Sequence, residues 1–335
     1  MSTPPSPALV FDTLNAYQRT EALRAALELD VFTAIGAGTD SASALAKQTG
    51  ASERGLRILA DYLTAVGFLT KKDNHYGLTP DSAMFLDRRS PACVASAVGF
   101  LASPGVMSHY VNLAAAVRKG GTAAEADGLV APEHGLWVDF ARSMQPMMVL
   151  PGELIARLLS AERGDRWKVL DIAAGHGIFG VTLARLNPNA EIVAVDWPNV
   201  LEVAKENARA AGVEQRYQTR PGSAMDVDFG EGYDLVLLTN FLHHFDVSTN
   251  EGVLRKVHAA LKPGGRAVIL ELVPNEDRVS PPLPAMFALI MLASTPAGDA
   301  YTFAEYREML QHAGFASSQL HPLPPTFQHV VIATK

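Results

Sequence analysis

Residues 169–180 read Val-Leu-Asp-Ile-Ala-Ala-Gly-His-Gly-Ile-Phe-Gly. The run starts as a short apolar strand and continues with Gly175, Gly177 and Gly180 in the pattern G-x-G-x-x-G. Glycines at a turn from a strand into a helix let the backbone pass close to a bound nucleotide. The stretch therefore predicts the first strand, turn and helix of an α/β domain with a nucleotide site at the carboxyl edge of its sheet.

The chain beyond this run alternates between apolar strands and helical stretches. Strands are predicted at 191–196, 233–238 and 267–271, helices at 181–186, 200–211 and 252–261, and two further strands within 317–335. Strands that are apolar throughout and joined by helices are typical of a parallel sheet covered on both faces. We therefore predict a doubly covered sheet after residue 166.

The first hundred residues have a different pattern, with short helices followed by a hairpin. Helices are predicted at 12–29, 43–49 and 52–66, and strands at 68–70 and 76–79 around a polar turn. This order is that of a winged helix, which invites a DNA-binding interpretation. The third helix carries Arg54 and Arg57 but also Glu53 and Asp61, whereas phosphate contacts call for an excess of basic residues. Self-association is the favoured interpretation.

Composition narrows the class of protein. The 335 residues include 28 Lys and Arg against 35 Asp and Glu, so the formal net charge is −7, and no basic stripe suits nucleic acid. Cys93 is the only cysteine, which excludes disulfide scaffolds, cysteine-rich zinc sites and iron–sulfur clusters. No apolar run reaches the roughly 18 residues that a membrane span requires, and the N-terminus lacks a signal-like pattern. We expect a cytoplasmic protein of two domains.

The stretch between the two patterns, 91–162, is helical in character and rich in methionine. Flexible thioethers adapt to an irregular apolar ligand, although they pack equally well in an ordinary core. The candidate residues for a pocket wall are Trp137, Phe140, Met144 and Met147.

Asp196 ends the second strand of the sheet, where a carboxylate is placed to accept hydrogen bonds from ribose hydroxyls. This pairing of a glycine loop with a strand-end acid is common to nicotinamide enzymes and to methyltransferases. By itself it predicts an adenosine-containing cofactor and leaves the reaction open.

Four further motifs occur in order along the chain: Asp196-Trp-Pro-Asn-Val200, Tyr233-Asp-Leu-Val-Leu237, Phe241-Leu-His-His-Phe-Asp246 and Leu261-Lys-Pro-Gly-Gly-Arg266. Together they make nearly the whole chain resemble class I S-adenosylmethionine-dependent small-molecule O-methyltransferases, related to caffeate, hydroxyindole and polyketide O-methyltransferases. The resemblance implies a Rossmann-like seven-stranded sheet whose last strand is antiparallel, and an N-terminal winged-helix domain that forms a homodimer. Its domains would be 1–100, a helical linker and pocket wall over 101–165, and a catalytic domain over 166–335.

The resemblance also implies the residues that bind S-adenosyl-L-methionine and its product S-adenosyl-L-homocysteine. They are Asp171, Ala173, Gly175, Gly177, Asp196, Trp197, Ser223, Ala224 and Asn240. Two departures stand out. Ser223 and Ala224 occupy a stretch where plant members have Gly-Asp-Met-Phe, and Ala173 and Ala174 replace two glycines. Alanine is tolerated there if its φ angle is negative, which is our expectation.

His243 occupies the position of the family's general base, and Glu271, 28 residues later, resembles the carboxylate that orients it. An imidazole of pKa near 6.5 can remove the proton of a phenol as the methyl bond forms. His244 replaces the family's aspartate and is expected in the acceptor pocket. Ala300 stands where the family has a second acid, which leaves Asp299 as a substitute from the next position.

The acceptor implied by the resemblance is a hydroxyl group of a small aromatic metabolite, with no metal, nucleic acid or membrane involved. Methylation of carbon or nitrogen, a relative that binds S-adenosylmethionine without methylating, a metal-assisted enzyme using His243 and His244, and a nicotinamide dehydrogenase remain as alternatives.

Overall fold

A computed structural model describes residues 5–124 and 136–335 of the chain. Part of the predicted linker, residues 125–135, lies outside the described residues, as do residues 1–4. Contacts divide the chain into two units, Met1–Met107 and Ser108–Lys335, which are considered separately below.

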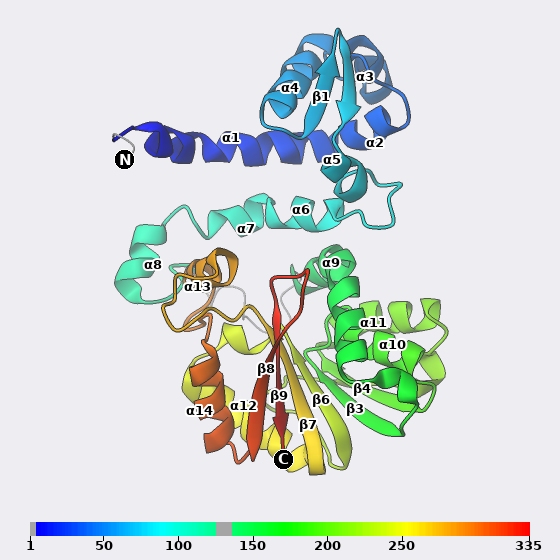
Figure 1. Cartoon of the computed structure of the whole chain (residues 1–335), viewed down its shortest axis with the longest axis vertical. Coiled ribbons are helices and arrows are strands. Elements are labelled where there is room, and N and C mark those ends of the chain that lie inside the picture. The colour runs from blue at the N-terminus through cyan, green and yellow to red at the C-terminus, as the bar shows by residue number, and fades with distance from the viewer. Residues whose placement is uncertain (1–4, 125–135) are drawn as a thin grey trace. The chain divides into compact units, whose positions relative to one another are not determined.

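The first unit is a set of helices around a two-stranded hairpin (Figure 1). Its elements are α1 (Ala8–Glu28), α2 (Val31–Gly36), α3 (Ala42–Thr49), α4 (Glu53–Ala65), β1 (Leu69–Lys72), β2 (His75–Leu78), α5 (Pro80–Phe85) and α6 (Ala95–Leu101), and α7 (Pro104–Ser108) crosses the unit boundary. The order of helices and hairpin agrees with the sequence prediction. The helix α2 was not predicted, and it begins after Asp30, which turns the chain at a φ of 53°.

Local sequence explains the ends of these elements. The hydroxyls of Ser41 and Ser52 accept the backbone N–H groups of Ala44 and Gly55 and so cap α3 and α4. The hairpin is tighter than predicted, since Lys72 pairs directly with His75 across a two-residue turn. One core, centred on Phe32, Leu45, Leu56 and Leu63, holds the unit together.

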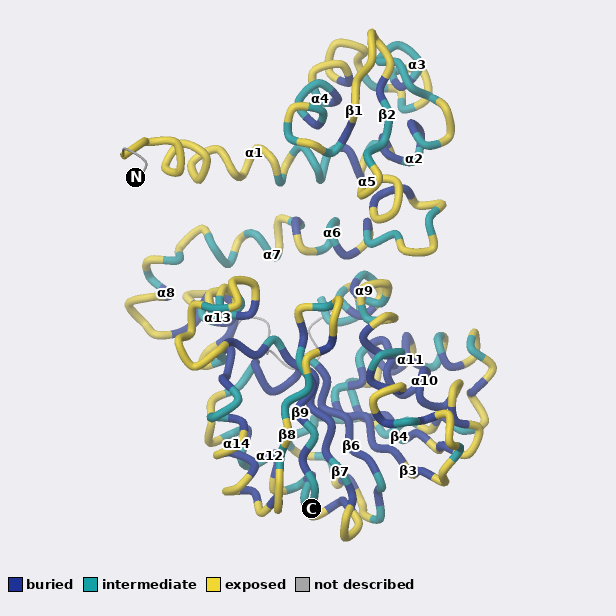
Figure 2. The backbone as a smooth tube through the Cα atoms, in the orientation of Figure 1, coloured by how far each residue is buried: buried dark blue, intermediate teal, exposed yellow. Residues whose placement is uncertain are grey.

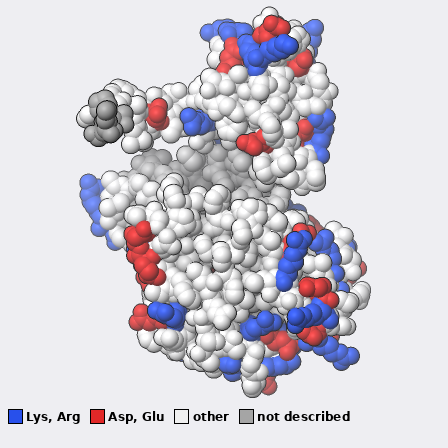
Figure 3. All heavy atoms as spheres, viewed as in Figure 1, with Lys and Arg blue, Asp and Glu red and all other residues white. Residues whose placement is uncertain are grey.

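The basic residues of α4 and β1 are partly neutralised within the unit. Asp61 lies 3.1 Å from Arg57 and 2.5 Å from Lys71, and the hydrogen bond from Lys71 lowers the pKa of this carboxyl. On the face drawn in Figure 3, Lys and Arg of this unit lie among Asp and Glu. On this face the charges are of mixed sign, whereas phosphate binding depends on an excess of basic side chains.

The second unit is a sheet with helices on both faces. Its strands are β3 (Trp167–Ile172), β4 (Ala190–Asp196), β5 (Tyr217–Pro221), β6 (Tyr233–Thr239), β7 (Leu261–Glu271), β8 (Ser317–Pro322) and β9 (His329–Thr334). Its helices are α8 (Leu113–Lys119), α9 (Leu136–Leu158), η2 (Ala161–Arg163), α10 (Ile178–Leu186), α11 (Pro198–Ala210), η3 (Glu214–Arg216), η4 (Leu242–His244), α12 (Val247–Ala260), α13 (Pro282–Ser294) and α14 (Phe303–His312).

The described sheet has seven strands in the order β5-β4-β3-β6-β7-β9-β8, and its first five are parallel. β9 pairs antiparallel with β7 and with β8, as predicted for the last strand. The strand order reverses between β3 and β6, and ligands of such sheets bind beyond the carboxyl ends of the strands at this point. We therefore expect the ligand-binding residues to follow Ile172 and Thr239, where β3 and β6 end.

Two apolar cores lie on opposite faces of this sheet. One joins residues of α9, α10 and α11 to the sheet, and the other joins those of α12 and α14. The central strands β3 and β6 are buried almost throughout, as is the second half of β7, whereas the edge strands β5 and β8 are largely exposed or half-buried (Figure 2). Burial on both faces explains why the central strands are apolar along their length rather than alternating.

Candidate active site

The glycine-rich loop leaves β3 through a left-handed residue. Ala173 has a φ of 52°, so the expectation of a negative φ was wrong at this position. The N–H of Ala174 donates to the backbone oxygen of Val195 in the neighbouring strand. This hydrogen bond requires the backbone to turn at Ala173, directly after β3. An alanine in this conformation costs roughly 1–2 kcal/mol.

The two glycines of the loop have different surroundings. A Cβ at Gly175 would meet nothing closer than the oxygen of Ala173 at 3.9 Å, which leaves room for a ligand beside the backbone. A Cβ at Gly177 would lie 2.5 Å from the hydroxyl of Tyr217 and 2.8 Å from the Cβ of Ala204. Gly175 therefore leaves the ligand side open, whereas Gly177 lets α10 start close to α11 and β5.

Asp196 lies at the end of β4 and holds the loop from the other side. Its two carboxyl oxygens accept the N–H groups of Gly175 at 2.8 Å and Trp197 at 2.7 Å. Burial raises the pKa of Asp196 to about 6, against the effect of these hydrogen bonds. A carboxylate has about four lone-pair positions, so each oxygen retains capacity for one hydroxyl of a ribose.

Asp171 lies deeper, beneath the loop, and is fully buried. One oxygen accepts the N–H of Gly180 at 3.2 Å, and the other has no partner among the described residues. Burial raises the pKa of this carboxyl to about 7. The hydroxyl of Tyr217 also lacks a partner among these residues. Two buried polar groups, Asp171 and Tyr217, therefore lie beneath the glycine loop.

A second loop, residues 222–227, lies beside Asp196, whose backbone carbonyl oxygen accepts the N–H of Gly222 at 2.9 Å. Ser223 uses its hydroxyl to accept the N–H of Met225, which shapes the turn. Lys256 of α12 fastens the loop by donating to the carbonyl oxygens of Ala224, Met225 and Val227 at 2.7–3.0 Å. No motif in the sequence pointed to this lysine.

Trp137 and Trp197 meet in a small apolar cluster between α9 and α11, around Ala141, Val200 and Val203. Trp137 also packs edge-on against Phe140 and His244, with ring centroids 5.5 and 5.6 Å apart. Of the predicted wall residues, Met144 is buried and Met147 is exposed. The structure thus connects Trp137 and Phe140 with the histidine pair.

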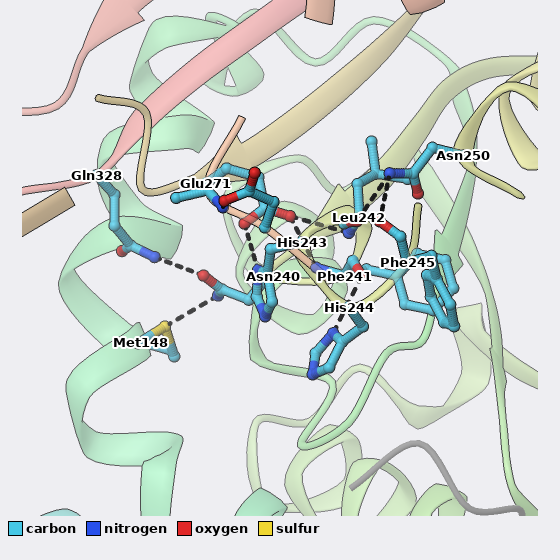
Figure 4. A network of polar contacts seen from close by, with 12 residues as sticks. Met148, Asn240, Phe241, Leu242, His243, His244, Phe245, Asn250, Glu271 and Gln328 are labelled. Carbon is cyan, nitrogen blue, oxygen red and sulfur yellow. Dashed lines mark hydrogen bonds and ion pairs between the residues drawn. The ribbon is translucent and has the colours of Figure 1, made fainter. Parts of the chain in front are cut away.

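His243 and Glu271 form the centre of the polar network in Figure 4. His243 Nδ1 lies 2.5 Å from Glu271 Oε2, and the other carboxyl oxygen accepts the N–H groups of Phe241 and Leu242 at 3.0 and 2.9 Å. Both side chains are nearly inaccessible, with Glu271 1% and His243 6% exposed. Three groups surround the carboxylate, and in a neutral His243 this contact places the proton on Nδ1 and leaves the lone pair on Nε2.

His244 lies against His243, with ring centroids 4.2 Å apart. Its Nδ1 donates to the oxygen of Phe241 at 3.1 Å, and burial lowers its pKa well below the ordinary value, as does His243. His244 is therefore neutral and cannot supply the charge of the aspartate that it replaces. Phe287 of α13 closes the other side of His243, edge-on at 4.8 Å, which the sequence did not indicate.

Asp299 approaches the site through its backbone, since its N–H donates to the oxygen of His243 at 3.0 Å. Its carboxyl group accepts the N–H of Ala300 and forms an ion pair with Arg278 at 3.3 Å. Ala300 is buried. Within the described ranges, no group of three or more His, Cys, Asp or Glu side chains is arranged to hold a metal ion.

Comparison with known proteins identifies the family. A family model described as the O-methyltransferase domain matches residues 130–316, and one described as the O-methyltransferase dimerisation domain matches residues 11–88. The chain belongs to the O-methyltransferase family. Members of this family use S-adenosylmethionine as their methyl donor, and this methyltransferase has the corresponding fold and loop.

Two relatives illustrate the likeness. The methyltransferase is 31% identical to a 3-hydroxy-5-methyl-1-naphthoate 3-O-methyltransferase of Streptomyces sahachiroi, over 93% of this chain and 91% of the relative. A structure described as a candidate O-methyltransferase of Nostoc punctiforme is 56% identical, with a TM-score of 0.96 over 99% of this chain and all of the other.

A third comparison concerns the fold. The structure of human N-acetylserotonin methyltransferase in complex with S-adenosylmethionine has a TM-score of 0.87 at 24% identity, over all of this chain and 99% of the other. None of the helices in the described ranges combines the length and apolar character needed to cross a membrane.

Proposed function

We propose that this methyltransferase transfers the methyl group of S-adenosylmethionine to a hydroxyl of a small aromatic metabolite, with His243 as the general base. The observation that carries the proposal is the 2.5 Å contact between His243 Nδ1 and Glu271 Oε2. It leaves the lone pair of Nε2 available to a proton donor. When bound, S-adenosylmethionine supplies a methyl group attached to a positively charged sulfur.

The residues described above fit this cofactor. Asp196 has lone pairs left for the ribose hydroxyls, Gly175 leaves its ligand side open, and Trp197 with Ser223 and Ala224 would border the adenine. Asp171 has an unpartnered oxygen below the loop. Adenosine binding therefore rests on residues from β3, β4 and the loop after β5.

His243 Nε2 accepts the proton of the acceptor hydroxyl as the oxygen–methyl bond forms and the sulfur–methyl bond breaks. The imidazolium that results is stabilised by Glu271, whose carboxylate already accepts three hydrogen bonds. S-adenosylhomocysteine and the methyl ether are the products. Base catalysis of this kind contributes about 10²–10⁴-fold. Trp137, Phe140 and His244 form the aromatic surface against which the acceptor ring packs.

We also propose that the protein is a homodimer formed through its first unit. The large apolar side chains in the first half of α1, including Phe11 and Leu14, are more than half exposed. Such a surface is unusual for a monomer and typical of an interface.

The test of the mechanism uses His243→Ala and Glu271→Gln with a series of phenols of decreasing pKa. The alanine variant should keep its affinity for S-adenosylhomocysteine and lose about 10²–10⁴-fold in kcat. In Glu271→Gln the oxygen stays on the two backbone N–H groups, so the amide faces Nδ1 as a donor. The tautomer of His243 is then reversed, and we expect a loss of similar order.

Both losses should shrink for acidic phenols such as 4-nitrophenol, because the phenolate forms without a base. Mass spectrometry and NMR of the product distinguish an O-methyl from a C-methyl or N-methyl compound. Turnover of a weakly acidic phenol by His243→Ala at the native rate would contradict base catalysis.

A further inference from the structure

The side-chain amide of Asn240 is held at both ends by residues outside the predicted site. Its Oδ1 accepts the Nε2–H of Gln328 at 2.7 Å, and its Nδ2 donates to the sulfur of Met148 at 3.5 Å (Figure 4). Met148 belongs to α9, and Gln328 lies in the loop between β8 and β9. The network thus joins three parts of the second unit that are distant in sequence.

Asn240 occupies a special position in the sheet. It follows β6 directly, as Ala173 follows β3, and these two strands flank the point where the strand order reverses. Both residues are left-handed, with φ angles of 53° and 52°, and the N–H of Asn240 donates to the oxygen of Leu270. Asparagine tolerates this conformation better than most residues. Its side chain is therefore fixed at the ligand-binding edge, three residues before His243.

The two partners of the amide differ greatly in strength. Gln328 supplies a short hydrogen bond to Oδ1, whereas a thioether sulfur is a weak acceptor for Nδ2. An oxygen atom of a ligand would be a better acceptor for Nδ2 than Met148. The oxygen and nitrogen ends of an asparagine amide have nearly the same shape, so their partners decide which end faces which way.

Gln328 is itself held in place. The residue is 9% exposed, its backbone N–H donates to the hydroxyl of Thr326 at 3.3 Å, and its backbone carbonyl oxygen accepts the N–H of Leu323. Leu323 is buried in the core that α9, α10 and α11 share with the sheet. These contacts fix the backbone of residue 328, and its low exposure keeps the side chain of Gln328 beside Asn240 rather than in solvent.

We infer that Gln328 is a positioning residue that orients the amide of Asn240 so that its Nδ2 donates to an oxygen atom of a bound ligand. The inference rests on the proposed function for the identity of the ligands, which are the cofactor and the aromatic acceptor. An oxygen of either one satisfies the same chemistry, and the measurements below separate the two.

Gln328→Glu is the decisive variant because it keeps the shape and replaces a donor by an acceptor. The carboxylate favours rotation of the Asn240 amide by 180°, which turns Oδ1 toward the ligand. We expect about a five- to tenfold loss of affinity for one ligand. The loss appears either as a raised dissociation constant for S-adenosylhomocysteine by calorimetry, or as a raised KM for 2-naphthol with kcat little changed.

Gln328→Met is the matched control, because it removes the partner without imposing the wrong orientation, so its loss should be clearly smaller. In an Asn240→Ala background, which lacks the amide, Gln328→Glu should cause no further loss of ligand affinity. Equal losses in the Glu and Met variants, or none in either, would overturn the inference and leave Gln328 as a packing residue of its loop.

The two proposals fail separately. Weaker binding of S-adenosylhomocysteine in Gln328→Glu, together with no methylation of any aromatic hydroxyl by the native enzyme, would support the positioning role and overturn the acceptor class. The native enzyme and Gln328→Glu could instead methylate 2-naphthol with equal KM and bind S-adenosylhomocysteine with equal affinity. That result would support the acceptor class and overturn the positioning role of Gln328.

Discussion

At the scale of single residues, the polar side chains of the candidate site hold one another in place. His243 has one nitrogen committed to Glu271, and Glu271 has both oxygens committed to donors. His244, next in the chain, has its Nδ1 committed to a backbone oxygen. Because the ring of His244 is neutral, the negative charge that would favour an imidazolium at His243 under the proposed mechanism comes from Glu271.

Asp171 yields a prediction about pH. Its ordinary pKa is 3.8, and burial raises it to about 7 in the folded protein. The folded chain therefore binds this proton more tightly than the unfolded chain, so the free energy of unfolding falls as pH rises from about 4 to about 7 and then levels off. Asp171→Asn lacks this effect. Its stability relative to the native protein should rise by about 1–3 kcal/mol between pH 5 and pH 8.

Urea unfolding of the ligand-free proteins at the two pH values measures this difference. A variant whose stability relative to the native protein is the same at pH 5 and pH 8 would show that folding leaves the proton affinity of Asp171 unchanged.

At the scale of elements, the glycine loop offers a matched pair of substitutions. Gly175→Ala and Gly177→Ala both place an alanine at positive φ, at a cost of roughly 1–2 kcal/mol each. Only at Gly177 does the new methyl group collide with Tyr217 and Ala204, which adds about 1–3 kcal/mol. Thermal unfolding should therefore show the larger loss for Gly177→Ala.

Among the molecules that fold, Gly175→Ala should bind S-adenosylhomocysteine more weakly than Gly177→Ala. The reason is that the new methyl group at residue 175 faces the open side of the loop, where the ligand is expected. If both variants lose stability equally and bind equally, the two glycines have no division of roles.

The loop at residues 222–227 depends on α12 through Lys256. Lys256→Met keeps the length of the side chain and removes three hydrogen bonds to the carbonyl oxygens of that loop. We expect a destabilisation of about 1–3 kcal/mol and a weaker affinity for S-adenosylhomocysteine, measured by calorimetry. Arg255→Met is the control on the same helix, since Arg255 is exposed and pairs only loosely with Glu251 at 3.4 Å. Equal effects of the two variants would refute the role of Lys256.

At the scale of the whole molecule, the exposed apolar side chains of α1 predict assembly. Leu14 and Tyr17 are each 62% exposed on a helix whose other end contributes Ala26 and Leu27 to the core. Stable homodimer interfaces of this kind commonly bury more than about 2,000 Å². We expect a dimeric mass by light scattering at micromolar concentration.

Leu14→Asp combined with Tyr17→Asp should shift the molecule toward the monomer, because charges are depleted from the centre of such interfaces. Gln18→Asp, an exposed polar position on the same helix, serves as the control. A native protein that is monomeric at micromolar concentration would contradict the assembly proposed for the first unit.

Local sequence pattern determined much of this protein. Continuous apolar runs predicted β3, β4, β6 and β7, because strands buried on both faces leave no place for polar residues. The pattern of short helices followed by two short strands around a polar turn predicted the first unit apart from α2. The edge strand β5 escaped prediction since it pairs only with β4 and its sequence, Tyr217-Gln-Thr-Arg-Pro221, is mostly polar. Motif spacing placed Asp196 and Glu271 at strand ends and His243 shortly after a strand, and the structure brings His243 and Glu271 into contact.

Only the tertiary structure decided what surrounds those residues. The contacts of Gln328 with Asn240, of Phe287 with His243 and of Lys256 with the second loop join residues 29–88 positions apart, and no local periodicity encodes such pairs. The φ of Ala173 and the proton affinity of Asp171 likewise depend on neighbouring strands and on the exclusion of water. Sequence pattern shows which residues lie at the edge of the sheet, because the end of a strand can be recognised from the residues next to it. Packing fixes their orientation and charge, because both depend on atoms contributed by distant segments.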